Sequence, residues 1–181
     1  MSQLIVLAFR DQFRAAEVLN DLKRRELDWA ADLDHAVVIT YDDAGQAKVQ
    51  LNVELSAGQT TAWASFWGSL LSVTLFLPST QILTQAAHGI TASLGNGIKS
   101  ARHEISNPTA SWWSNELGVE ELFLRDIGAL VKDGGSAIFM LLHTSEGFLV
   151  RRELQNYGNM IIHATLSLEQ DRKISDYFAL K

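Results

Sequence analysis

The feature that most constrains this chain is a run of 44 residues without a charged side chain, from Leu55 to Ile98, bounded by Glu54 and Lys99. It begins LSAGQTTAWASFWGSLLSVTLFLP and is rich in tryptophan and small residues. A segment of this size must be buried against protein or lipid, because soluble monomers rarely expose an apolar patch so large. Which of the two it contacts decides most of what the sequence says about function.

The remainder of the chain has an ordinary composition that excludes several classes of protein. With 181 residues, 47% of them hydrophobic, it predicts one domain, or one domain with a sizeable insertion, and argues against disorder. A net charge of −6 argues against nonspecific binding of nucleic acid. The absence of cysteine excludes disulfides and thiolate chemistry. The opening MSQLIVLAFRDQF lacks the basic region and the length of a signal peptide, which predicts a cytoplasmic location.

Outside the uncharged run, strand and helix patterns alternate along the chain. Continuous or alternating apolar residues predict strands over 4–9, 35–41, 48–53, 137–143 and 160–166. Apolar residues at helical spacing predict helices over 12–25, 119–132, 146–157 and from 168 to about 180. Asp11 is placed to cap the first helix, and Ser167 with Gln170 has the spacing of a capping box at the last. A turn at 42–45 predicts that the second and third strands form a hairpin.

These elements predict an α+β protein with a ferredoxin-like fold, in which two split βαβ units share one antiparallel sheet. The predicted domain comprises residues 1–54 and 118–181. Residues 55–117 are then an insertion, formed by an uncharged helical hairpin broken at Pro78 and followed by a loop that contains Trp112 and Trp113. The two tryptophans are either core residues or a contact site.

Both ends of the chain also resemble a known family. The segments LIVLAFRDQFRAAEVLNDL and LGVEELFLRDIGALVKDGGSAIFMLL are similar to a bacterial family of predicted membrane proteins, the domain of unknown function 1269. The resemblance is carried in particular by Gly118, Phe123, Gly128, Gly134, Ser136 and Ala137. The family's insertion is a glycine zipper, and here Ala64, Gly68 and Ser72 keep small residues at every fourth position. The resemblance implies no catalytic activity.

The chain shows no motif for catalysis, for a cofactor or for a metal. The five histidines lack metal-ligand spacing, and His103-Glu104 does not continue to H-E-x-x-H because Asn107 takes the second histidine position. No G-x-S-x-G surrounds a serine, and Gly95-Asn96-Gly97 lacks the third glycine of a dinucleotide loop. We therefore predict a protein that is not an enzyme. His143 and His163 are interpreted as structural, with a site between them as the alternative.

Three arrangements of the uncharged segment are compatible with its sequence. As a helix, residues 62–77 would span about 24 Å, which is short of the roughly 30 Å hydrocarbon core. The favoured alternative is self-association of the helix pair, since small residues allow close approach and aromatic residues are common at interfaces. In the other two, the pair covers a sheet face within one chain or forms a short membrane hairpin. The predicted interaction residues are Trp63, Ala64, Trp67, Gly68, Leu71, Ser72, Leu75 and Phe76.

The sequence thus predicts a structural or interaction protein that forms a homo-oligomer and takes no cofactor, metal or nucleic acid. A peripheral contact with the inner membrane is kept as an alternative for the uncharged segment. A second alternative, by analogy of fold alone, is a regulatory module that binds a small ligand.

Overall fold

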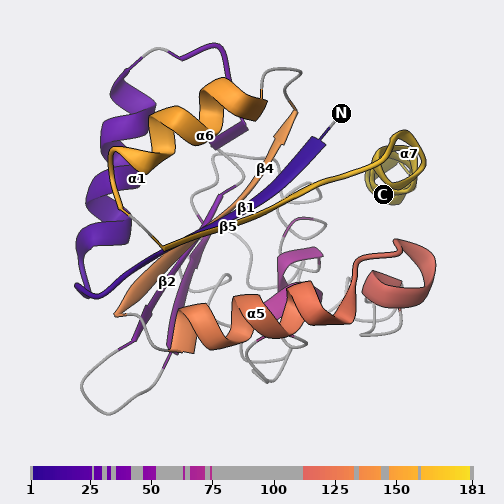
Figure 1. Ribbon diagram of the computed structural model, residues 1–181, viewed down its shortest axis with the longest axis horizontal. Helices are drawn as coiled ribbons and strands as arrows, with labels where there is room; N and C mark the ends of the chain where they lie inside the picture. Colours follow the sequence, from indigo (N-terminus) through magenta and orange to yellow (C-terminus); the bar gives the residue numbers. More distant parts are fainter. Residues whose placement is uncertain are drawn as a thin grey trace, which may run out of the picture.

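A computed structural model describes the sheet, the helices around it and part of the uncharged segment. The described residues are 2–25, 27–29, 32–33, 36–41, 47–51, 63, 66–71, 74, 112–132, 135–143, 147–158 and 160–179. They form an α+β protein built on a five-stranded antiparallel sheet (Figure 1). The second arm of the predicted hairpin, 81–98, and the predicted loop 107–111 lie outside the described residues.

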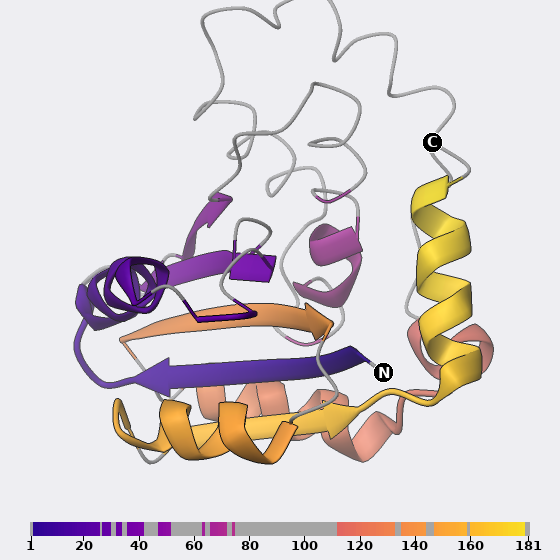
Figure 2. The same ribbon diagram turned by 90° about the horizontal axis from the view of Figure 1, so that it is seen from above.

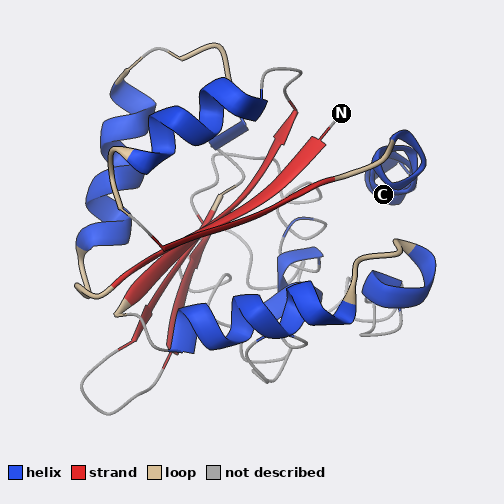
Figure 3. Ribbon diagram, viewed as in Figure 1, coloured by secondary structure: helices blue, strands red, loops and turns tan. Residues whose placement is uncertain are grey.

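The strands and helices agree closely with those expected from the apolar pattern (Figure 3). The strands are β1 (Ser2–Phe9), β2 (Val37–Tyr41), β3 (Ala47–Leu51), β4 (Ser136–His143) and β5 (Met160–Thr165). The helices are α1 (Arg14–Arg24), α5 (Glu121–Lys132), α6 (Gly147–Gln155) and α7 (Leu168–Ala179), with a single π-helical turn η2 (Trp112–Glu116). Trp63, residues 66–71 and Thr74 are helical as well. The expectation that Trp112 and Trp113 lie in a loop was wrong, because both lie in η2.

The strands are interleaved in the order β3-β2-β4-β1-β5, and every neighbouring pair is antiparallel. The expected hairpin of β2 and β3 is confirmed. Because β4 pairs antiparallel with both β1 and β2, the latter two run parallel to each other, and α1 connects them. In the same way β4 and β5 flank β1 and are connected by α6. Each helical connection therefore passes over a strand from the other half of the chain.

The alternation of side chains along each strand divides the core into two parts. Ile5 and Leu7 of β1 point to the face covered by α1 and α6, as do Ile138 and Met140 of β4. Residues of opposite parity, such as Val6 and Phe139, point to the face covered by α5, α7 and the described helical residues of the uncharged segment (Trp63, 66–71 and Thr74). Figure 2 looks onto the sheet with α1 and α6 in front and α5 behind. Both faces of the sheet are therefore covered by helices.

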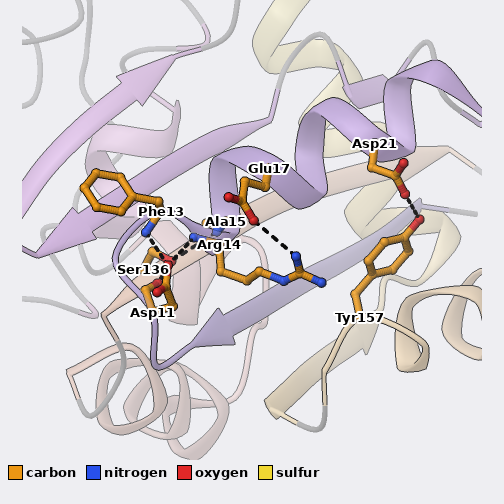
Figure 4. A network of polar contacts seen from close by, with 8 residues as sticks. All are labelled: Asp11, Phe13, Arg14, Ala15, Glu17, Asp21, Ser136 and Tyr157. Carbon is orange, nitrogen blue, oxygen red and sulfur yellow. Dashed lines mark hydrogen bonds and ion pairs between the residues drawn. The ribbon is translucent and has the colours of Figure 1, made fainter.

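The start of α1 is tied to the start of β4 by a compact set of hydrogen bonds (Figure 4). The N-cap residue of α1 is Phe13, two positions after the predicted Asp11, and Phe13 makes no side-chain cap. The Asp11 carboxylate nevertheless accepts hydrogen bonds from the backbone N–H groups of Phe13 at 2.8 Å and Arg14 at 3.0 Å, at the start of the helix. The Ser136 hydroxyl donates to the Asp11 carbonyl at 2.6 Å and accepts from the N–H of Ala15 at 3.2 Å. The Ser136 side chain of β4 thus satisfies one backbone group in the loop before α1 and one in the first turn of α1.

The capping box at the start of α7 is also confirmed. The N–H of Ser167 donates to Oε1 of Gln170 at 2.7 Å, and the N–H of Gln170 donates to the Ser167 hydroxyl at 3.2 Å. Gln170 also donates through Nε2 to the carbonyl of Leu117 at 2.6 Å. This bond holds the start of α7 against the segment that leads into α5. The helices α5 and α7 therefore begin close together.

Candidate interaction surface

The described members of the predicted interaction set lie inside the chain's own core. Trp63, Trp67, Gly68 and Leu71 are buried, and the three larger side chains belong to the apolar cluster beneath the sheet. This is the arrangement in which the uncharged segment covers a sheet face within one chain. The remaining four residues of that set, Ala64, Ser72, Leu75 and Phe76, lie outside the described residues.

Aromatic rings connect the uncharged segment to the sheet, to η2 and to α7. The ring of Phe66 lies 5.0 Å from that of Trp113 and 5.1 Å from that of Trp67, measured between centroids. Trp63 stacks on Phe178 of α7 at 4.3 Å. Trp113 is fully buried and donates through Nε1 to the Ser69 hydroxyl at 2.7 Å. The sequence left Trp113 as either a core residue or a contact site, and its burial shows that it is a core residue.

The segment also makes a close backbone contact with α5. A Cβ atom added to Gly128 would lie 2.2 Å from the carbonyl oxygen of Thr74. Real Cβ atoms do not approach backbone atoms so closely, and therefore this position of α5 requires glycine. The small residue brings the two helical backbones together, and the packing occurs within one chain.

The two edges of the sheet differ in the charge that they present. β3 forms one edge and carries the exposed Lys48, and an edge lysine is a common device against unwanted pairing of sheets. β5 forms the other edge, with the sequence MIIHAT, and contains no Asp, Glu, Lys, Arg or Pro. Among the described residues β5 pairs only with β1. Figure 1 looks directly onto this edge, with β5 in front of the other strands.

Exposed apolar side chains occur on the helices around β5. Of the large hydrophobic residues in the described part of the chain, four exposed ones belong to α5, α6 and α7: Leu122 (55% exposed), Phe148 (72%), Leu149 (46%) and Leu168 (63%). α6 leads into β5, α7 follows it, and α5 packs against it. Figures 1 and 2 show α6 and α5 on the two sides of the strand. We call β5 together with these four residues the β5 edge.

His163 is the one titratable side chain on β5. Its Nε2 atom is hydrogen-bonded to the guanidinium of Arg151 on α6. A guanidinium can only donate, so the ring accepts at Nε2. Partial burial, together with the nearby positive charge of Arg151, lowers the pKa of His163 below 6.5. The imidazole is therefore neutral at physiological pH, and the strand itself carries no charge there.

His143 lies at the end of β4 in a different environment. Its backbone N–H donates to Oδ2 of Asp32 at 2.5 Å. Its ring atom Nδ1 lies 3.3 Å from Oδ1 of the same carboxylate. The hydrogen bond with Asp32 raises the pKa of His143 above 6.5. Strand alternation places His143 on the sheet face of Phe139, whereas His163 is opposite Ile5, on the other face. The two histidines do not share a site.

Polar side chains also join α1 to α6 on the outer face of the sheet. The hydroxyl of Tyr157 donates to the Asp21 carboxylate and accepts from Nη1 of Arg25 at 2.9 Å (Figure 4 shows the first contact). Arg25 also forms an ion pair with Glu153 of α6. Burial and the hydrogen bond to Asp21 raise the pKa of Tyr157 above 10. Each of these polar groups has a hydrogen-bond or ion-pair partner within the group, and we assign the group a structural role.

Searches for a metal site and for a membrane span give no candidate in the described part of the chain. No three His, Asp or Glu residues among those described are placed to hold a metal ion. Within the same residues, no helix combines the length and the apolar character needed to cross a bilayer.

Comparison of the chain with models of protein families, with curated proteins and with solved structures gives no significant match. The similarity to the domain of unknown function 1269 therefore stays a resemblance, supported by the residues named above.

The sequence did not identify the β5 edge as a surface. The segment from 160 to 166 has the apolar character of a strand in the middle of a sheet, and nothing local shows that it lies at an edge. Phe148, Leu149 and Leu168 could have indicated the surface, because these large apolar residues lie outside the buried faces of their own helices.

Proposed function

We propose that this protein is a non-enzymatic interaction protein that assembles with further copies of itself. The observation that carries the proposal is the β5 edge: an uncharged strand whose side away from β1 pairs with no other strand among the described residues, with exposed apolar side chains on the helices around it. Natural sheets usually block such edges with charge, proline or a covering element, because an open edge pairs readily with another chain. The lack of charge and proline on β5 therefore supports a role in association.

We further propose that the scaffold is a ferredoxin-like sheet with β3 added beside β2 and with residues 55–117 inserted between β3 and α5. The interleaving of β1-α1-β2 with β4-α6-β5 supports this description. The inserted segment would then cover the sheet face opposite α1 and α6, in keeping with the buried positions of Trp63, Trp67 and Trp113. Because both faces of the sheet are then covered, a partner would have to bind at an edge.

Multi-angle light scattering of the purified protein without detergent tests the proposal. We expect a dimer or a larger defined assembly that dissociates on dilution. A monodisperse monomer throughout the micromolar range would overturn it. Addition of detergent separates the alternatives, because assembly by strand pairing does not require a micelle, whereas a membrane hairpin would bind one.

A further inference from the structure

The backbone groups that β5 presents at its free edge follow from its pairing with β1. The N–H of Leu166 donates to the carbonyl of Ser2 at 2.9 Å, so this pair exchanges hydrogen bonds across the ladder. In an antiparallel ladder the bonded pairs alternate, and residues 160, 162 and 164 therefore direct their N–H and C=O groups toward β1. Ile161, His163 and Thr165 direct theirs away from the sheet.

These three residues can pair with the same three residues of a second copy. In a symmetric antiparallel pairing, the two-fold axis must pass beside a residue of β5. An axis at His163 pairs Ile161 with Thr165 of the second copy and His163 with its equivalent. An axis at 162 or 164 would move one of the three outward residues beyond the bounds of β5. The register centred on His163 therefore forms the most hydrogen bonds within the strand.

Charge and area also favour a second copy of this chain. In a molecule of net charge −6, association of identical surfaces is opposed by like charges. β5 itself carries none, and the charge beside His163 is the Arg151 guanidinium, whose sign is opposite to that of the net charge. The strand has six residues and is only about 20 Å long, at roughly 3.3 Å per residue. A standard interface buries about 800 Å² on each partner, which a single strand edge does not provide. The interface would therefore have to include exposed apolar side chains from the neighbouring helices α5, α6 and α7.

We infer that two copies of this chain pair through β5 in antiparallel orientation about a two-fold axis at His163, which joins their sheets into one continuous sheet. This inference rests on the proposed function and specifies its surface. The imidazole of each copy stays bonded to its own Arg151 on α6. Phe148 and Leu149 of α6 then pack near the axis on that face.

Cysteine cross-linking tests the register, because the natural chain contains no cysteine. In a hydrogen-bonded antiparallel pair the Cα atoms are about 5.5 Å apart, within the range of roughly 4.4–6.8 Å that a disulfide spans. We expect a His163→Cys variant to form a covalent dimer under mild oxidation. The matched control is Lys48→Cys on the edge strand β3, which should remain uncross-linked.

Oppositely charged substitutions at position 163 provide a second test, whose expected result would not arise from misfolding of either variant. His163→Asp and His163→Lys each place like charges directly opposite one another, and we expect each variant alone to be monomeric with an unchanged circular dichroism spectrum. Mixing the two should restore a heterodimer.

The outcomes separate this inference from the proposed function. Cross-linking at position 163 together with recovery of the heterodimer would support both. A natural chain that is dimeric, but whose variants neither cross-link at position 163 nor lose the dimer on charge substitution, would overturn the β5 pairing and leave self-association intact. A monomeric natural chain would overturn both.

Discussion

At the scale of single residues, Gly128 shows most directly how packing decides the amino acid. A glycine inside a helix usually costs about 1 kcal/mol relative to alanine, so a Gly→Ala change in α5 should ordinarily stabilise the protein. Here the added Cβ would meet the Thr74 carbonyl at 2.2 Å, and backbone is less able to yield than a side chain. We expect Gly128→Ala to lower the free energy of unfolding by about 1–3 kcal/mol in urea titrations. The exposed Ala129 provides the control, as Ala129→Ser should have a much smaller effect.

His143 gives the protein a stability that depends on pH. Because its pKa is higher in the folded state than the ordinary 6.5, the protonated form favours folding. The stabilisation is complete below 6.5 and is lost as the pH rises through the folded-state pKa. We expect Asp32→Asn to destabilise the protein at about pH 5 and to have a smaller effect at about pH 8, measured by thermal unfolding. An amide at position 32 still accepts the N–H of His143, so an equal loss at both pH values would contradict the assignment.

At the scale of elements, the start of α1 depends on Asp11 more than on the neighbouring ion pair. Asp11 accepts two backbone N–H groups, whereas Glu17 forms a solvent-exposed pair with Arg14 at 3.1 Å. We expect Asp11→Ala to cost about 0.5–2 kcal/mol, the range found for helix caps. Glu17→Ala is the matched control in the same helix and should cost less than about 1 kcal/mol. Chemical denaturation compares the two, and equal losses would argue against capping by Asp11.

Most elements could be predicted because their signal is local. The apolar spacing of Val18, Leu19 and Leu22 is sufficient for α1, and the alternation of Val49 with exposed neighbours is sufficient for β3. The turn η2 was missed because a single π-helical turn has too few residues for a periodic pattern. Its second residue, Trp113, is hydrogen-bonded to Ser69, which lies 44 positions earlier. Such a contact leaves no mark on the sequence around the tryptophan.

At the scale of the whole molecule, the sheet depends on β5, the last strand, to pair with the free side of β1, the first. β1 pairs with β4 on one side and with β5 on the other, and Leu166 and Ile174 complete the core beneath it. We expect a chain that ends at Tyr157 to lose cooperative thermal unfolding, because β1 would become an edge and its covering helix α7 would be missing. A truncated chain that unfolds as sharply as the full one, followed by circular dichroism, would contradict this view.

The candidate surface could not be predicted for a reason that belongs to this scale. The uncharged segment was expected to face a second copy, and its described aromatic residues instead fill the core of their own chain. Whether a strand is central or at an edge depends on the order β3-β2-β4-β1-β5, which no stretch of sequence contains by itself. The apolar residues of β5 are compatible with either position.

The central place of β1 also has a consequence for synthesis. Of the five strands of the sheet, β1 is synthesised first, yet both of its ladder partners begin after residue 135. The hairpin of β2 and β3 can form as soon as it emerges, whereas the six apolar residues from Leu4 to Phe9 must wait until β4 has been made. During that interval the nascent protein carries an unpaired, aggregation-prone strand, and its yield in the cell will depend on how well chaperones shield β1.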